Sequence, residues 1–259
     1  GASFHVEEKL SAGERISIRQ GGATVGTWRI GIVPDKAPEI RFGAPPKATA
    51  RLALEVRYAA SDDYGVTRVL MEIRRENSDE VVQIDLPLVT TAPKTAGDTS
   101  FHDLTAHPWA GLPVSLRLVA QDALNQTGAS EDVKIVLPER VFTHPVAQAL
   151  VEQRRELSIR LDTKMRVARA LAGLSLAPEA FNRDLVISLG LGVASARLRH
   201  DHRPAAVPSV QELLWDMALR LEDGDMSLAD RSLRDIQRAL QEALARNAPD
   251  AGSEQLLQE

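Results

Sequence analysis

The tripeptide His200-Asp201-His202 contains the residue types that most often bind metals. It ends a stretch with helical spacing, and side chains two positions apart on a helix point in different directions. Two imidazoles at this spacing do not converge on one ion. The chain has no cysteine, which excludes thiolate zinc sites and disulfides. We therefore interpret the tripeptide as a polar helix end.

Carboxylates in two expected turns could instead hold calcium, which takes six to eight oxygen ligands. Asp62-Asp63 and Asp122, with Asn125, provide four side chains. Their spacing matches no known calcium loop, and Asx hydrogen bonds within turns explain the same residue types. The sequence thus predicts no metal site, and calcium near Asp62, Asp63 and Asp122 stays open as the exception.

The segment Gly190-Leu191-Gly192 follows an apolar run and has the first two glycines of a dinucleotide fingerprint. Ser195 stands where the third glycine would be, and the flanking residues have helical rather than βαβ patterning. Small residues for close helix packing explain the segment better.

No residues have the pattern of a catalytic site. The chain lacks a Gly-x-Ser-x-Gly motif, and its carboxylate pairs have no apolar surroundings that would raise a pKa. We expect no enzymatic activity and no cofactor. A hydrolase is the second alternative function, and it would need two polar residues with perturbed pKa values in one pocket.

Two aromatic residues are candidates for contact with a partner. Trp109 lies in the expected loop His107-Pro108-Trp109-Ala110-Gly111, and Tyr64 lies in the turn Asp62-Asp63-Tyr64-Gly65. Either ring could stack on a sugar, so a carbohydrate or peptidoglycan-binding module is the first alternative function. A tryptophan in such a loop also commonly plugs the end of a β-sandwich, and the burial of Trp109 discriminates between these interpretations.

Composition narrows the class of protein further. The 259 residues are 44% apolar, enough for a core without disulfides, and the net charge of −5 disfavours a nucleic-acid partner. The sequence contains no run of 18 apolar residues, the length at which a segment becomes a candidate membrane span.

The apolar pattern changes near residue 140. Before it, short runs alternate with period two, as in half-buried strands, and turn signals such as Gly21-Gly22 and Ala44-Pro45-Pro46 separate them. Strands are expected at 15–19, 27–33, 52–60, 66–74, 81–86, 114–120 and 133–137. The prolines of Pro34-Asp35-Lys36-Ala37-Pro38 indicate a joint.

Helices are expected after residue 140. Pro145 opens the first, with Val146, Leu150, Gln153 and Leu157 on one face. Three later segments supply apolar positions at helical spacing: Met165, Ala168, Leu171 and Ala172; Leu185, Val186, Leu189, Val193 and Ala196; Val210, Leu213, Leu214, Met217 and Leu221. Gly224 ends the last of these.

A further helix is expected over 228–246. Its seam of Leu233, Ile236 and Leu240 could pack on the 210–221 helix, a partner protein or a second copy. With Trp109 and Tyr64, these residues are the candidate partner-binding residues.

The predicted fold is all-β plus all-α, an immunoglobulin-like β-sandwich followed by a small α-helical bundle. Residues 35–139 form the sandwich, and residues 140–259 form the helical module. Residues 1–34 hold either terminal strands of a preceding β domain or edge strands added to the sandwich.

Several stretches resemble known families. Asp62–Val66 and Ala120–Gln126 resemble bacterial immunoglobulin-like domains. The stretches 103–113, 137–145 and 214–225 resemble an uncharacterised alphaproteobacterial membrane-protein family, domain of unknown function 4175. That resemblance implies a membrane-anchored protein with an extracytoplasmic remainder at the periplasmic face of the inner membrane, and it carries no catalytic residues.

The leading functional hypothesis is therefore a periplasm-facing scaffold or adaptor that binds other envelope proteins. We expect no nucleic-acid partner, and we expect membrane contact only through a segment outside this chain.

Overall fold

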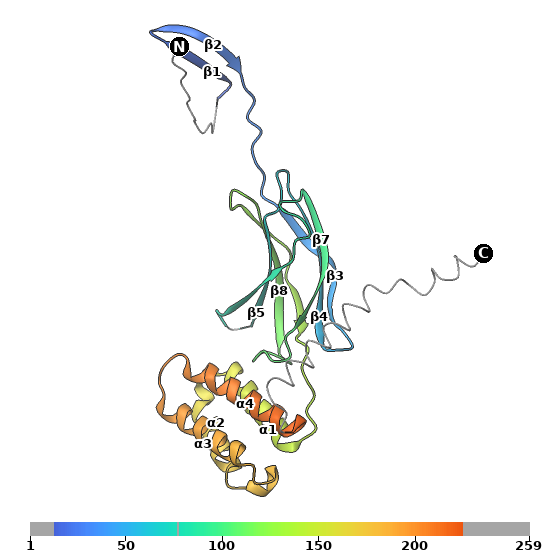
Figure 1. Ribbon diagram of the computed structural model, residues 1–259, viewed down its shortest axis with the longest axis vertical. Helices are drawn as coiled ribbons and strands as arrows, with labels where there is room; N and C mark the ends of the chain where they lie inside the picture. The colour runs from blue at the N-terminus through green and yellow to red at the C-terminus, as the bar shows by residue number, and fades with distance from the viewer. Residues whose placement is uncertain (1–12, 77, 225–259) are drawn as a thin grey trace, which may run out of the picture. The chain divides into compact units, whose positions relative to one another are not determined.

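The computed structural model describes residues 13–76 and 78–224 (Figure 1). Ten strands in antiparallel sheets and four α-helices make up this part of the chain. It divides into two compact units. The first unit contains the residues up to 103 and residues 112–137, and the second contains residues 104–111 and the residues from 138 on.

The first unit begins with a hairpin. β1 (Arg15–Gln20) and β2 (Ala23–Arg29) pair only with each other among the described strands. Gly21 and Gly22 form the two-residue turn between them, both with positive φ, as the sequence predicted. Because the pair forms its own two-stranded sheet, it adds no edge strand to the sheets that follow.

A three-stranded sheet contains β3 (Glu39–Ala48), β4 (Ala53–Ser61) and β7 (Thr95–Asp103), in the order β3-β4-β7. The turn predicted at Ala44-Pro45-Pro46 is wrong, because these residues lie inside β3. The pairing with β4 shifts register on both sides of Ala44, and β3 is an edge strand. Bulges on an edge strand are the positions where a sheet tolerates proline, since no ladder hydrogen bond is lost.

The larger sheet has the order β10-β8-β5-β6, and β9 also pairs with β8. Its strands are β5 (Arg68–Arg75), β6 (Val81–Leu86), β8 (Pro113–Gln121), β9 (Thr127–Ala129) and β10 (Val133–Val136). Strand β3 of the smaller sheet contacts β8, β9 and β10.

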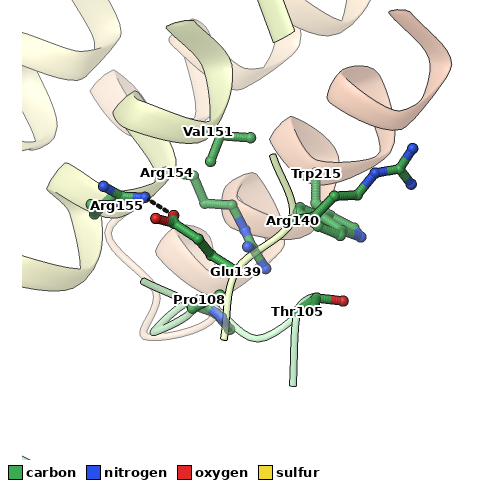
Figure 2. Close-up of a pocket in the computed structure, with 9 residues that line it drawn as sticks. Thr105, Pro108, Glu139, Arg140, Val151, Arg154, Arg155 and Trp215 are labelled. Carbon is green, nitrogen blue, oxygen red and sulfur yellow. Dashed lines mark hydrogen bonds and ion pairs between the residues drawn. The ribbon is translucent and has the colours of Figure 1, made fainter. Parts of the chain in front are cut away.

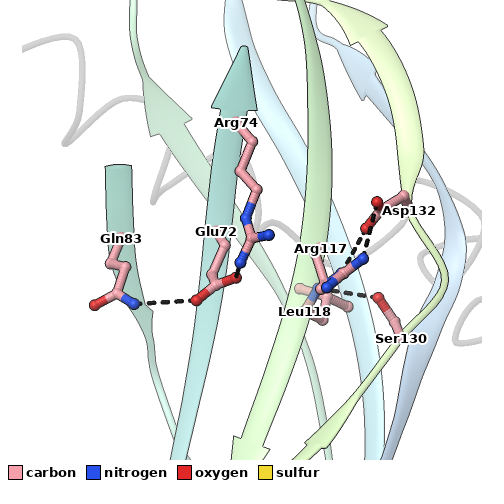
Figure 3. A network of polar contacts seen from close by, with 7 residues as sticks. All are labelled: Glu72, Arg74, Gln83, Arg117, Leu118, Ser130 and Asp132. Atoms are coloured by element: carbon pink, nitrogen blue, oxygen red, sulfur yellow. Dashed lines mark hydrogen bonds and ion pairs between the residues drawn. The ribbon is translucent and has the colours of Figure 1, made fainter. Parts of the chain in front are cut away.

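In the larger sheet, buried and more exposed positions alternate along β5 and β8, as the sequence predicted. The buried positions include Val69, Met71 and Ile73 of β5 and Val114, Leu116, Leu118 and Ala120 of β8. Several intervening positions carry polar side chains, and some of these bond to polar neighbours (Figure 3). Glu72 accepts hydrogen bonds from Arg74 and Gln83 across β5 and β6, and Arg117 donates two to Asp132. One face of this sheet is therefore apolar and the other carries charge pairs.

Four α-helices build the second unit. They are α1 (Pro145–Ile159), α2 (Lys164–Leu174), α3 (Leu185–His200) and α4 (Ala206–Asp223), with short 3₁₀ turns at Leu161–Thr163 and Pro178–Phe181. α1 packs on α4, α2 on α3, and α3 on α4. The core includes Leu150, Leu171, Phe181, Leu191 and Leu214, which are almost completely buried.

Helix ends follow sequence signals. His144 caps α1 through Nδ1, which accepts from the Val146 backbone N–H at 3.2 Å, and Pro145 follows at the first helical position. Asp184 caps α3 by accepting from the backbone N–H groups of Val186 and Ile187. α4 ends at Asp223, and Gly224 follows with positive φ, as predicted.

Two helical faces differ from the prediction. In α2, Val167, Ala168 and Leu171 are buried, but Met165 is 51% exposed. In α3 the buried apolar side chains are Ile187, Leu191, Ala194 and Leu198, and Gly190 and Ser195 are buried with them. The residues that the sequence suggested for this helix, Leu185, Val186, Leu189 and Val193, are exposed. α3 is apolar nearly all round, so periodicity alone could not select its buried face.

Candidate functional site

Residues 104–111 follow β7 and precede β8 in the chain, yet they belong to the helical unit. Trp109 in this segment is only 3% exposed. Its ring and the His107 ring pack edge to face, with their centroids 5.1 Å apart. The backbone N–H of Trp109 donates to Nδ1 of His107. A ring buried to this extent has no free face for a sugar, so the carbohydrate interpretation loses its main residue.

Arg154 of α1 connects this segment to two helices (Figure 2). Its side chain donates to the backbone carbonyls of Ala106 and His107, and at 3.0 Å to that of Gln211 in α4. Its guanidinium also lies over the ring of Trp215, 4.9 Å from the ring centre. The apolar pattern indicated Gln153 for the buried face and not Arg154, because arginine is seldom buried.

Two neighbours of Arg154 complete the network. The side-chain amide of Gln211 donates to the Arg154 carbonyl and, at 2.7 Å, to the Ser158 hydroxyl. That hydroxyl donates to the Pro108 carbonyl at 3.0 Å. Three buried polar side chains from α1 and α4 therefore hold the backbone of residues 106–108.

The charge of Arg154 is desolvated and affects its neighbours. Burial lowers the pKa of Arg154 to about 10, although the charges of Asp216 and Glu212 oppose this effect. Burial, and then the positive charge of Arg154, lower the pKa of His107. His107 is therefore held in its neutral form, which suits its role as acceptor for the Trp109 N–H.

The hollow beside Arg154 is lined largely by polar and charged residues. Figure 2 shows its lining, which includes Thr105, Glu139, Arg140, Arg155 and Trp215. Glu139 is bonded to Arg155, and the side chain of Arg140 donates to Asp223. Ion pairs therefore engage Glu139, Arg140 and Arg155, which fits a structural role for this lining.

The two acidic turns of the first unit lie where the sequence predicted turns. Asp62 directly follows β4, and its Oδ2 accepts from the backbone N–H groups of Tyr64 and Gly65 at 3.0 and 2.6 Å. Asp122 directly follows β8, and its Oδ1 accepts from the backbone N–H groups of Leu124 and Gln126. These bonds are the Asx bonds that the sequence analysis invoked.

The acidic side chains that lie together differ from the set that the sequence suggested, which was Asp62, Asp63 and Asp122 with Asn125. Asn125 is exposed, and its Oδ1 accepts from the Gln121 amide. Asp35, in the segment between β2 and β3, joins Asp62 and Asp63 instead. The sequence analysis treated Asp35 only as part of a proline-flanked joint, because nothing in the local pattern connects it to a turn 27 residues away. Tyr64 in the same turn is 59% exposed.

The remaining candidates have structural explanations or lie elsewhere. Gly190 faces Met217 of α4, where a Cβ atom would lie 2.4 Å from the sulfur, so it serves close helix packing. His200 ends α3 and is exposed, and so is His202. Leu233, Ile236 and Leu240, the predicted seam, fall outside the described residues.

The outer side of α3 carries a strip of exposed apolar residues. Leu185 is 76% exposed, Leu189 70%, Val186 54% and Val193 48%. Gly192 and Ala196 on the same side are also exposed. The strip ends at a basic last turn that contains Arg199 and His200. Contiguous exposed apolar surface of this kind marks interaction sites in folded proteins.

Comparisons with known proteins place the chain in a family. Within residues 13–76 and 78–224, no helix combines the length and apolar character needed to cross a bilayer. No curated protein matches the sequence. The model of an uncharacterised family matches residues 1–259, so the chain belongs to the family of the domain of unknown function DUF4175.

Proposed function

We propose that this chain is the extracytoplasmic scaffold portion of a membrane-anchored envelope protein, at the periplasmic face of the inner membrane, and that it binds other proteins. The observation that carries the proposal is the apolar strip on α3. Four large apolar side chains on one side of a helix, each about half exposed or more, need a partner to remove them from water.

The shape and charge of the strip specify the partner. Leu185, Leu189 and Val193 are spaced by four residues, the spacing that packs against another helix. Gly192 has no side chain, and nothing lies within 4 Å of its Cβ position. A partner helix can therefore approach closely at this point. The basic last turn favours acidic groups on the partner. The proposed occupant is therefore an amphipathic helix of another envelope protein, with acidic residues beside its apolar strip.

The proposed fold of the first unit is an immunoglobulin-like β-sandwich. Its support is the burial of one face in the larger sheet, the contacts of β3 with β8, β9 and β10, and the exclusively antiparallel pairing of the described strands.

Site-specific photo-crosslinking tests the proposal in the intact membrane-anchored protein. A photoreactive residue at Leu189 should capture a different envelope protein, which mass spectrometry of the crosslinked peptides identifies. The matched control is the same residue at Glu152, an exposed position on α1. Leu189→Glu should remove the captured protein and leave the melting temperature unchanged, because the side chain is 70% exposed.

Other products at position 189 would contradict the proposal. Crosslinks to residues 225–259 of the same chain would show that the strip is covered internally. Crosslinks to a second copy would show a homo-oligomer interface. Equal capture of one protein from positions 189 and 152 would show that contact is not specific to the strip.

A further inference from the structure

Four carboxylates converge in the first unit from three separate segments. Asp35 lies between β2 and β3, Asp62 and Asp63 directly follow β4, and Asp122 directly follows β8. Carboxylate oxygens of Asp35, Asp62 and Asp63 all lie within 4.8 Å of one another. Asp122 is close enough for its charge to act on Asp35. The cluster is therefore a product of the tertiary fold and not of one loop.

Three oxygens of the cluster are buried without a hydrogen-bond partner: Oδ1 of Asp35, Oδ1 of Asp62 and Oδ2 of Asp122. Asp62 is only 9% exposed and Asp122 only 2%. In each of these two residues the other oxygen is used by the Asx bonds of its turn, so one oxygen is held in a fixed position and left over. Buried polar atoms are nearly always satisfied, and three unsatisfied carboxylate oxygens in one cluster indicate a missing ligand.

The charge of the cluster points to a cation. In the described part of the chain, no salt bridge involves any of the four aspartates. Carboxylates that repel one another at this range need either a shared proton or a positive ion between them.

Other contacts also bring together the segment before β3 and the turns after β4 and β8. The Gln126 side chain contacts Asp35, and the Lys36 backbone N–H approaches Asp63 Oδ1 at 3.5 Å. The Thr67 hydroxyl donates to the carbonyls of Gln121 and Asp122, which joins the turn after β4 to the turn after β8. The fold thus positions the oxygens before any ion arrives.

We propose that Asp35, Asp62, Asp63 and Asp122 bind one calcium ion. The donors are all hard oxygens, and neither histidine nor cysteine is among them, which disfavours zinc and copper. Calcium accepts carboxylates from several separate segments at irregular angles, whereas magnesium demands a near-ideal octahedron. The bound ion would join the 30–38 segment to the ends of β4 and β8.

The experiment is a thermal melt of the 259-residue chain with calcium, with magnesium and with a chelator, together with calorimetric titration of calcium. We expect binding of one calcium per chain with a dissociation constant on the order of 0.1–1 mM, as in extracellular modules. The melting temperature should rise by about 3 °C in 5 mM calcium, fall back with chelator, and change much less in 5 mM magnesium.

Asp63→Asn and Asp35→Asn are the test variants, because Asp62 and Asp122 also hold their turns and their loss could prevent folding. In chelator, each variant should melt at the same temperature as the unmodified chain or higher, because one repelling charge is gone. Each should lose most of the rise with calcium. Asp79→Asn, which makes the same charge change at the other end of β5, should keep the full rise.

Three results would overturn the proposal. The first is no rise in melting temperature up to 5 mM calcium. The second is an equal rise in magnesium or in sodium chloride of matched ionic strength, which would indicate charge screening alone. The third is a full calcium response in both Asp35→Asn and Asp63→Asn.

Discussion

The guanidinium of Arg154 lies over the indole of Trp215 at 4.9 Å, and its hydrogen bonds go to backbone carbonyls and not to a carboxylate. Its side chain satisfies carbonyls of residues 106, 107 and 211 at once. A buried charge paired in this way serves mainly to fix one arrangement of the backbone, since its own desolvation offsets much of the attraction.

Replacing Arg154 with methionine keeps an unbranched apolar stem and removes every donor. We expect the free energy of unfolding of the helical unit to fall by about 3 kcal/mol, because buried carbonyls lose their partners. Urea titration followed by circular dichroism measures the change. Arg155→Met is the matched control, since Arg155 pairs with Glu139 at a more exposed position, and it should cost less than about 1 kcal/mol. Equal losses in the two variants would refute the special role of Arg154.

The lowered pKa of His107 predicts how the free energy of unfolding depends on pH. Its pKa in the folded chain lies below the usual value of 6.5, because of burial and of the charge of Arg154. Between these two pKa values the unfolded chain binds a proton that the folded chain does not. The free energy of unfolding should therefore be steady above pH 6.5 and fall as the pH decreases below it.

Urea titrations between pH 7.5 and 5.5 measure this slope. His107→Asn keeps an acceptor for the Trp109 N–H and should flatten part of the slope. Burial also lowers the pKa of His102, so His102→Asn should flatten another part with the same sign. A slope unchanged by His107→Asn would show that His107 is not desolvated.

Two glycines on α3 predict opposite effects. Gly192 is exposed, with nothing near its Cβ position, so Gly192→Ala should stabilise the helical unit by about 0.5–1 kcal/mol through helix propensity. Gly190 abuts the Met217 sulfur, so Gly190→Val should destabilise it by about 2 kcal/mol through overpacking. Thermal melts compare the two, and a tolerated valine at position 190 would argue against close packing of α3 on α4.

The proline-flanked segments 34–38 and 138–145 are the two joints of the chain, and they should differ in protease sensitivity. At the second joint, Phe142 is 4% exposed, and Glu222 accepts from the backbone N–H groups of Thr143 and His144. At the first, Val33 is 72% exposed. Among the described residues, limited proteolysis followed by mass spectrometry should cut within residues 31–34 before 139–143. Early cleavage at 139–143 would mean that Glu222 does not hold that joint.

Local patterns predicted most of the elements but not their partners. Alternation identified β5 and β8, while β7 escaped notice because Thr95–Asp103 has no apolar alternation, and its place comes from pairing with β4 along its whole length. Burial of Arg154 and the approach of Asp35 to Asp62 depend on residues distant in sequence. Neither leaves a periodic signal, so a single sequence could not reveal them.

Because residues 104–111 belong to the helical unit, they are synthesised before the helices that hold them. The chain passes between the units three times, and β8 leaves the ribosome well before α1 and α4, which hold the 106–108 backbone. Arg154 comes 48 residues after Ala106, and α4 ends only at Asp223. At about 5–20 residues per second, the segment with Trp109 waits roughly 5–20 s for its last support. For that interval the backbone of residues 106–108 lacks the side chains that hold it in the finished protein.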